Sequence, residues 1–224
     1  MSIETIIEAK GVKKRFGKTP VLRGIDLLVS RGEILAIMGP SGSGKSTLLH
    51  CLAGIDSASG GTIMYNNKDI VQLDDKTRTI LRRTDFGFVF QFSQLVPELT
   101  ALDNVAIPLL LGGTKKALAY DKAKKWLHEV GLEGKENNLP GELSGGEEQR
   151  VSIARAMIIE PRVLFADEPT GSLDSLNSEQ IMELFVDVVK KHNTTVIIVT
   201  HEPTIAAYAD REIIVRDGLL SGTR

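Results

Sequence analysis

A glycine-rich segment places the strongest constraint on the fold of this chain. Gly39-Pro40-Ser41-Gly42-Ser43-Gly44-Lys45-Ser46-Thr47 follows a short apolar run and precedes a helical stretch. In that context the glycines let successive backbone N–H groups turn inward around an anion, and the helix N-terminus adds partial positive charge. We expect Lys45 to reach the β- and γ-phosphates and Ser46 to offer a hydroxyl to Mg²⁺. The sequence therefore predicts a strand, loop and helix that bind ATP.

A second apolar run, residues 163–166, ends in two consecutive carboxylates. At the end of a buried strand, Asp167 is suited to hold Mg²⁺ through the water shell of the metal. The adjacent Glu168 can polarise and orient an attacking water as general base. Alone, two acids after an apolar strand also fit an ordinary solvated strand terminus. Together with the phosphate loop they predict hydrolysis of the bound triphosphate.

The remaining hydrophobic patterns predict an α/β fold with a mixed central sheet. Short apolar runs typical of strands buried on both faces occupy residues 34–38, 163–166 and 196–199. Helical periodicity occupies residues 45–53, 149–159 and 178–191. An N-terminal antiparallel β element is expected from residues 6–29 and 63–65, with turns at residues 17–18 and 66–67. Residues 91–141 carry a helical pattern at 120–130 and no convincing strand, which predicts a helical lobe.

Composition restricts the partners and the compartment. The 27 Lys and Arg residues nearly balance the 29 Asp and Glu residues, so no overall field favours nucleic acid. The basic pairs are short and dispersed and are interpreted as solvated faces. The single cysteine, Cys51, lies in an apolar stretch and is expected to be buried and inert. The first ten residues lack a secretory pattern, and the longest apolar run, residues 105–111, is too short to span a membrane. We therefore expect a cytoplasmic chain whose membrane role comes through a partner.

A third motif begins at Leu143. Leu143-Ser144-Gly145-Gly146-Glu147, followed by Gln149 and Arg150, resembles the signature motif of the ATP-binding cassette family. Ser144 and the two glycines present a hydroxyl and backbone donors at a helix N-terminus, which makes a second anion site. In the family this motif clamps the γ-phosphate of ATP held by the opposite subunit. The resemblance implies a head-to-tail dimer of two copies with two ATP molecules at the interface.

Other family landmarks match in the same order along the chain. The resemblance implies that Phe16 stacks on adenine, that Gln91 senses the metal, and that His201 contacts the γ-phosphate. Ser172-Leu173-Asp174 is similar to the family segment that follows the base, called the D-loop. Taken alone, Phe16 also fits a core position, Gln91 a loop amide, and His201 a capping or buried histidine.

The resemblance covers essentially the whole chain and implies one nucleotide-binding domain over residues 1–224. It implies a RecA-like core with the antiparallel β element at about residues 1–90 and 160–224, and a helical lobe at about residues 91–159. Glu147 departs from the common pattern because the signature usually has glutamine there. A carboxylate near a polyphosphate can slow hydrolysis or weaken closure. We instead expect this side chain to point along the interface, so that Glu147→Gln changes turnover less than about tenfold.

Residues 86–91, 95–100 and 103–105 resemble one branch of the family. This branch contains ATPases for lipoprotein release, macrolide export and antimicrobial-peptide export, and a related cell-division ATPase. The resemblance implies a subunit on the cytoplasmic face of the membrane that drives a separate permease, for export or extraction of a lipoprotein, peptide or antibiotic. Leu95, Leu99 and Leu102 fit equally a groove for the coupling helix of that permease and the core of the helical lobe.

Two other functions remain open at this stage. In the first, the same ATP cycle regulates cell-wall enzymes through a membrane partner without transport, as in the cell-division relatives. In the second, the chain is a soluble cassette protein of DNA repair, chromosome organisation or translation. The short separation between Lys45 and Ser144 leaves no room for the long coiled coil of the repair proteins, and residues 1–224 contain no second cassette of the translation type. Fold alone does not decide among these functions.

Overall fold

The computed structural model describes residues 4–223 and divides the chain into two compact units. Unit 1 comprises residues 1–82 and 193–224, and unit 2 comprises residues 83–192. Residues 1–3 and 224 of the expected domain lie outside the described residues. The expected division at about residues 1–90, 91–159 and 160–224 stays a prediction.

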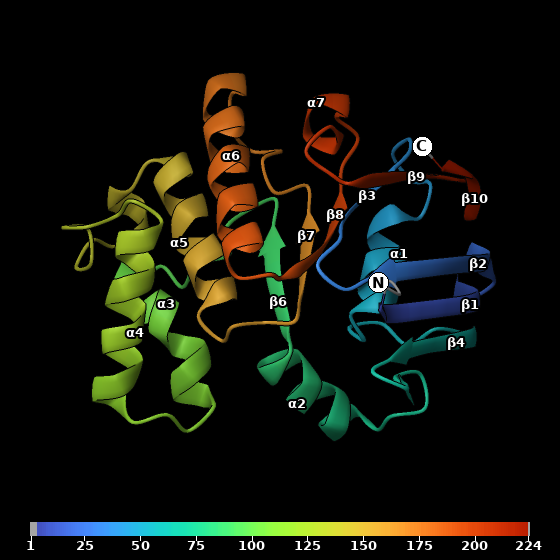
Figure 1. Cartoon of the computed structure of the whole chain (residues 1–224), viewed down its shortest axis with the longest axis horizontal. Helices are drawn as coiled ribbons and strands as arrows, with labels where there is room; N and C mark the ends of the chain where they lie inside the picture. Colours follow the sequence, from blue (N-terminus) through green and yellow to red (C-terminus); the bar gives the residue numbers. More distant parts are fainter. Residues whose placement is uncertain (1–3, 224) are drawn as a thin grey trace. The chain divides into compact units, whose positions relative to one another are not determined.

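Unit 1 contains the antiparallel β element. Its strands are β1 (Thr5–Phe16), β2 (Thr19–Ser30), β4 (Gly60–Tyr65) and β5 (Lys68–Asp69), in the order β2-β1-β4-β5. Figure 1 shows β2, β1 and β4 side by side. Asn66 and Asn67 join β4 to β5 with φ values of 46° and 63°, which a tight hairpin turn requires at both central positions. Alternate side chains of β1 and β2 are buried, as a sheet with one covered face requires. The predicted antiparallel element is confirmed.

Unit 1 also contains a mixed arrangement of four strands. The strand β3 (Ile34–Met38) pairs in parallel with β8 (Thr195–Val199) and with β9 (Arg211–Arg216), and β10 (Leu219–Thr223) pairs antiparallel with β9. Every side chain of β8 is buried, which explains its continuous apolar sequence. Helix α1 (Lys45–Leu52) follows β3, and the short helix α7 (Pro203–Ala206) follows β8. The mixed α/β fold class is confirmed.

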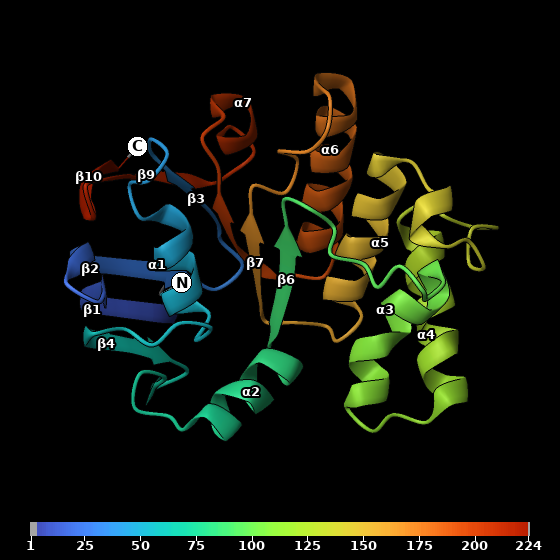
Figure 2. The same ribbon diagram turned by 180° about the vertical axis from the view of Figure 1, so that it is seen from behind.

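Unit 2 combines two strands with four helices. The strands β6 (Phe86–Phe90) and β7 (Val163–Asp167) are parallel, and Phe86 contacts Phe165 edge to face. The helices are α3 (Ala101–Leu111), α4 (Lys116–Glu129), α5 (Gly145–Met157) and α6 (Ser175–Lys191) (Figure 2). A single 3-10 turn, Pro140–Glu142, precedes α5. Helices α3, α4 and α5 pack on one another, so this part of the chain is helical, as the sequence predicts.

Helix boundaries differ from the expected ones where a side chain caps the helix. Helix α5 begins at Gly145, four residues before the predicted start, because Ser144 accepts a hydrogen bond from the backbone N–H of Glu147. Helix α6 begins at Ser175, three residues early, because the Asp174 carboxylate accepts from the N–H of Asn177. The sequence patterns did not predict α2 (Asp75–Thr84), which has no buried residue, or α3, which contains Pro108.

The structure also shows the surroundings of the single cysteine and the character of the helices. Cys51 is buried, as predicted, with 1% of its surface exposed. Across residues 4–223, no helix combines the length and the apolar character that crossing a membrane requires.

Candidate functional site

The phosphate loop of unit 1, defined as residues 39–44, connects β3 to α1. Lys45 is 7% exposed, and its ammonium donates hydrogen bonds to the carbonyl oxygens of Gly39 at 2.9 Å and Pro40 at 3.1 Å. An ammonium has three donors, so two of them close the loop and one remains for a further acceptor. Among the described residues 4–223, no side chain caps the N-terminus of α1, whose first residue is Lys45. The loop therefore has the geometry of an anion cradle.

Two glycines of the loop have a positive φ and close neighbours that leave little space for a side chain. Gly39 has φ of 145°, and an added Cβ would lie 2.1 Å from the carbonyl oxygen of Val215. Gly44 has φ of 104° and lies against Leu22. The hydroxyl of Ser43 is buried and has no hydrogen-bond partner among residues 4–223. A buried hydroxyl without a partner is costly, which fits a loop shaped to receive a ligand acceptor.

The turn between β9 and β10 holds the phosphate loop in place. The Gly218 N–H donates to the Ser43 carbonyl oxygen at 3.0 Å, and the Gly218 carbonyl accepts from Arg23 N–H at 2.9 Å. An added Cβ at Gly218 would lie 2.1 Å from the carbonyl oxygen of Val21, and the residue has φ of 75°. The sequence patterns did not predict this turn as part of the site. The sequence feature that indicates it is the Asp217-Gly218 pair, a dipeptide typical of hairpin turns.

The aromatic ring expected to stack on adenine lies at the end of β1. Phe16 is 51% exposed, so one broad face of a large apolar side chain remains accessible to solvent. The Lys14 ammonium lies 4.8 Å from the ring centroid and also donates to the Ser57 carbonyl oxygen at 2.9 Å. This cation–π contact covers part of the ring and orients it. The exposed surface is consistent with stacking on a base.

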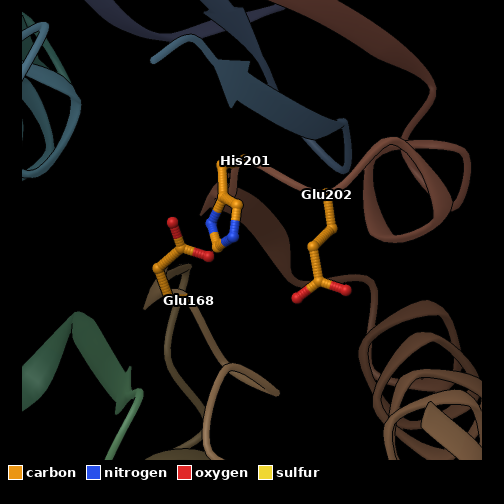
Figure 3. A group of neighbouring side chains, drawn as sticks. All are labelled: Glu168, His201 and Glu202. Atoms are coloured by element: carbon orange, nitrogen blue, oxygen red, sulfur yellow. The ribbon is translucent and has the colours of Figure 1, made fainter. Parts of the chain in front are cut away.

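His201 and Glu202 follow β8 in unit 1 (Figure 3). The Thr200 N–H donates to the Ile37 carbonyl oxygen of β3 at 3.2 Å, and the Thr200 hydroxyl accepts from the Glu202 N–H at 3.1 Å. These bonds fix the backbone on both sides of the histidine. His201 itself is exposed, which excludes the buried-histidine alternative.

The two consecutive carboxylates lie at the end of β7 in unit 2. Asp167 is the last residue of the strand, and both Asp167 and Glu168 are half-buried. Figure 3 shows the side chain of Glu168. Glu168 has φ of 49°, a left-handed conformation that is unusual for a residue with a side chain. Backbone strain of this kind is concentrated at functional positions, where it aims a side chain. The Gly171 N–H donates to the Glu168 carbonyl oxygen at 3.0 Å and stabilises the turn.

Gln91 follows β6 and contacts the segment after the carboxylates. Its Nε2 donates to the Gly171 carbonyl oxygen at 3.2 Å, while its own carbonyl oxygen accepts from the Ser172 hydroxyl at 2.8 Å. An added Cβ at Gly171 would lie 3.0 Å from that Nε2. This orientation presents the side-chain oxygen of Gln91 as the atom able to ligate a metal.

A buried glutamine joins the ends of both strands of unit 2. Gln149 is 1% exposed, and its Nε2 donates to the carbonyl oxygens of Phe90 at 3.1 Å and Pro169 at 2.6 Å. Since Phe90 ends β6 and Pro169 follows Glu168, helix α5 fixes the exits of both strands. The sequence had indicated Gln149 only as part of the signature motif, so its bracing role was missed.

The signature motif forms a capped helix N-terminus. The Ser144 hydroxyl accepts from the Glu147 N–H at 3.3 Å, and the Glu147 carboxylate accepts from the Ser144 N–H at 2.8 Å. The hydrogen bond from the Ser144 backbone, with the side-chain contacts of Lys135 and Ser144, lowers the pKa of Glu147. An added Cβ at Gly145 would lie 3.3 Å from Leu173, so the signature and the D-loop pack together. Asp174 caps α6, and the Asn177 N–H lowers its pKa.

The donor groups of each unit fit Mg²⁺ and a triphosphate. Unit 1 offers the Ser46 hydroxyl at the start of α1, and unit 2 offers the Asp167 carboxylate and the Gln91 amide oxygen. These are hard oxygen ligands, the type that Mg²⁺ prefers. The uncapped N-terminus of α1, the partnerless Ser43 hydroxyl and the Lys45 ammonium fit phosphate oxygens. Each expected role of these residues stays a prediction.

Known proteins resemble this chain over nearly its full length. Residues 22–171 match the family model described as ABC transporter. The lipoprotein-releasing system ATP-binding protein LolD of Cytophaga hutchinsonii is 41% identical over 97% of this chain and 100% of its own. The LolD protein of Legionella pneumophila strain Lens is 46% identical over 89% of this chain and 88% of its own.

Solved structures agree with this match. A dimeric bacterial ABC transporter cassette has a TM-score of 0.89 and 37% identity, with 98% of each chain covered. A dimeric post-hydrolysis state of an ATP-binding cassette bound to ADP and Pi has a TM-score of 0.88, with the same identity and coverage. The ATP-binding cassette fold is thereby confirmed. This chain belongs to the ABC transporter family and is an ATP-binding ATP hydrolase of that family.

Proposed function

We propose that this chain is the energy-coupling subunit of a lipoprotein-release system. Two copies close head to tail around two ATP molecules and drive a separate integral membrane permease. The subunit lies on the cytoplasmic face of the membrane through that permease and takes no nucleic acid. The main observation in support of ATP binding and hydrolysis is the environment of Lys45. Its buried side chain closes the glycine loop with two hydrogen bonds, and the third N–H of its ammonium remains for a phosphate oxygen.

The phosphate loop and Phe16 hold the nucleotide in this proposal. The backbone N–H groups of residues 41–47 surround the phosphates, and Lys45 neutralises the β- and γ-phosphates. Phe16 stacks on the adenine, and Lys14 holds the ring from one side. Stacking of a base on an aromatic ring contributes about 1–3 kcal/mol and discriminates weakly between bases.

Glu168 acts as general base in the proposed hydrolysis. Its carboxylate takes a proton from the attacking water, and the left-handed backbone at this position directs the side chain. His201 contacts the γ-phosphate by hydrogen bonding. Ser46, Gln91 and Asp167, the last through water, would hold Mg²⁺, which supplies charge neutralisation at the β- and γ-oxygens.

The presence of two anion sites supports the proposed dimer. The N-terminus of α1 belongs to the nucleotide of the same chain, whereas Ser144, Gly145, Gly146 and Glu147 at the start of α5 would meet the nucleotide of the second copy. The D-loop residues Ser172, Leu173 and Asp174 would lie at the same interface. The dimeric state of the solved cassettes supports this reading.

Lipoprotein release is favoured by the curated relatives. Several from different bacteria carry the name of the lipoprotein-releasing system and align over most of this chain. Neither the fold nor the site residues favour the cell-division alternative. The separate permease fits a chain in which residues 4–223 contain no helix suited to crossing a membrane.

A first experiment tests the cradle. Binding of a fluorescent ATP analogue is measured for the native chain and for Lys45→Ala, with Lys125→Ala as a control at an exposed lysine of α4. We expect Lys45→Ala to lose binding because the buried charge that meets the phosphates is gone. Full affinity in this variant would refute the assignment.

A second experiment tests the partner. Tagged Glu168→Gln subunit is purified with ATP and Mg²⁺ from detergent-solubilised native membranes, and co-purifying proteins are identified by mass spectrometry. We expect a stoichiometric multi-spanning permease, and the reconstituted complex should release a lipoprotein from proteoliposomes when given ATP. Recovery of soluble partners alone would overturn the membrane-coupled function. A permease without lipoprotein release would overturn the assigned substrate.

A further inference from the structure

Both carboxylate oxygens of Glu147 are engaged within unit 2. Oε2 accepts from the Ser144 N–H at 2.8 Å, and Oε1 lies 3.2 Å from the Lys135 ammonium. Lys135 belongs to the segment between α4 and α5, and its own N–H donates to the Leu132 carbonyl oxygen at 3.1 Å. The lysine therefore reaches the signature motif from a segment that the motif itself does not include.

This ion pair lies where the proposed site meets a polyphosphate. The Ser144 oxygen accepts from the Glu147 N–H, so its hydroxyl proton is directed to another acceptor. The first N–H groups of a helix lack intrahelical acceptors, which makes those of Gly145 and Gly146 available for an anion. A hollow of about 260 Å³ opens beside Ser144, Gly146 and Glu147.

A carboxylate in this position opposes the binding of an anion unless its charge is balanced. The side chains of Lys135 and Glu147 are 42% and 28% exposed, so solvent screens the pair only partly. Exposed ion pairs of this kind contribute little to folding. The effect of Lys135 should therefore appear in nucleotide binding at the signature motif rather than in the stability of the chain.

We propose that Lys135 is a positioning residue of the signature motif. It balances the charge of Glu147 and keeps that carboxylate turned onto the Ser144 N–H. Ser144, Gly145 and Gly146 can then meet the triphosphate held by the second copy. The inference rests on the proposed function, because it needs a nucleotide shared between two copies.

The test is a double-mutant cycle on the full chain. Lys135→Met, Glu147→Gln and the double variant are compared with the native chain. The exposed lysine Lys125 supplies the control Lys125→Met. KM and kcat for ATP are measured by steady-state hydrolysis. The ATP concentration that gives half-maximal dimer is measured by light scattering, with each substitution placed in a Glu168→Gln background.

We expect Lys135→Met to raise KM and the half-maximal ATP concentration about five- to tenfold, which corresponds to an uncompensated charge near the phosphates. The double variant should return both values to within about twofold of Glu147→Gln. That rescue separates charge compensation from a structural role, because removing the carboxylate does not restore a lost packing contact. Unfolding midpoints should agree for all variants.

Two outcomes overturn the inference while the proposed function stands. In the first, the native chain hydrolyses ATP and dimerises, and Lys135→Met matches Lys125→Met. In the second, Lys135→Met is impaired and Glu147→Gln gives no rescue. If the Glu168→Gln chain without any further substitution forms no dimer at any ATP concentration, the proposed dimer itself fails, and the inference fails with it.

Discussion

The guanidinium of Arg155 donates to the carbonyl oxygen of Ser93 at 2.6 Å and thereby fastens the segment after Gln91 to helix α5. A second bond from the same guanidinium reaches the Gln94 carbonyl oxygen at 2.8 Å. The Ser93 hydroxyl donates to the Glu148 carboxylate, also on α5, at 2.8 Å. The helix that begins at the signature motif thus holds residues 93–94, which follow Gln91.

Arg155→Met should loosen this segment. Burial lowers the pKa of the Arg155 guanidinium, and its removal leaves two carbonyl oxygens without their charged donor. Since hydrogen bonds to charged groups contribute roughly 1.5–3 kcal/mol, we expect a loss of about 2 kcal/mol in the free energy of unfolding in urea. Arg162→Met, at an exposed arginine, serves as the control. Equal midpoints for the two variants would show that the bracing bonds are dispensable.

Gly218→Ala should distort the phosphate loop from a distance. The new Cβ would approach the Val21 carbonyl oxygen to 2.1 Å at a φ of 75°, so the turn must move and release its bond to Ser43. We expect a destabilisation of about 2 kcal/mol and a several-fold rise in KM for ATP. Gly222→Ala, where an added Cβ meets open space, is the control for denaturation and kinetics. An unchanged KM in Gly218→Ala would separate the turn from the site.

Glu168→Gln should bind ATP and stall. The amide keeps the shape of the side chain but does not accept a proton, and loss of a general base lowers turnover by about a hundredfold or more. We expect near-native affinity for a fluorescent ATP analogue together with loss of phosphate release. Glu179→Gln, on the exposed face of α6, is the matched control. Native turnover in Glu168→Gln would assign the base to another group.

Cys51 should resist thiol reagents in the folded chain. Burial raises the pKa of its thiol to about 11, against 9.0 for the unperturbed group. A raised pKa lowers the thiolate fraction at pH 8, and the thiolate is the reactive form. We expect negligible labelling by a disulfide reagent at pH 8 and stoichiometric labelling after unfolding in guanidinium. Rapid labelling of the native chain at pH 8 would contradict the burial of this residue.

Much of the fold was predictable because its signals are local. Residues 34–38 carry an unbroken apolar run, and the structure has a strand with these bounds. Asn66-Asn67 tolerates the positive φ of a tight turn, so the hairpin could be placed from two residues. Helix α3 was not predicted, because Pro108 interrupts its pattern and its stability depends on packing against α4 and α5.

The candidate site likewise contains residues that the sequence predicts and residues that only the structure reveals. Spacing and residue type suffice to predict roles for Lys45, Glu168 and Ser144, since a phosphate loop, a strand-end carboxylate and a capped helix have sequence patterns of their own. These roles stay predictions. Gln149, Arg155 and Gly218 act through backbone groups distant in sequence. These are the carbonyl oxygens of Phe90, Ser93 and Ser43 and the N–H of Arg23. No local sequence pattern predicts such contacts.

Glycine loops, paired acids and a serine before two glycines are recognisable from residue types and spacing, so the proposed chemistry could be predicted without coordinates. The tertiary structure, in contrast, shows how those groups are held. It placed the Asp217-Gly218 turn against the phosphate loop and paired Lys135 with the carboxylate of Glu147. Neither contact follows from a local pattern, because the folded backbone, rather than residue identity, brings the two groups of each contact within hydrogen-bonding distance.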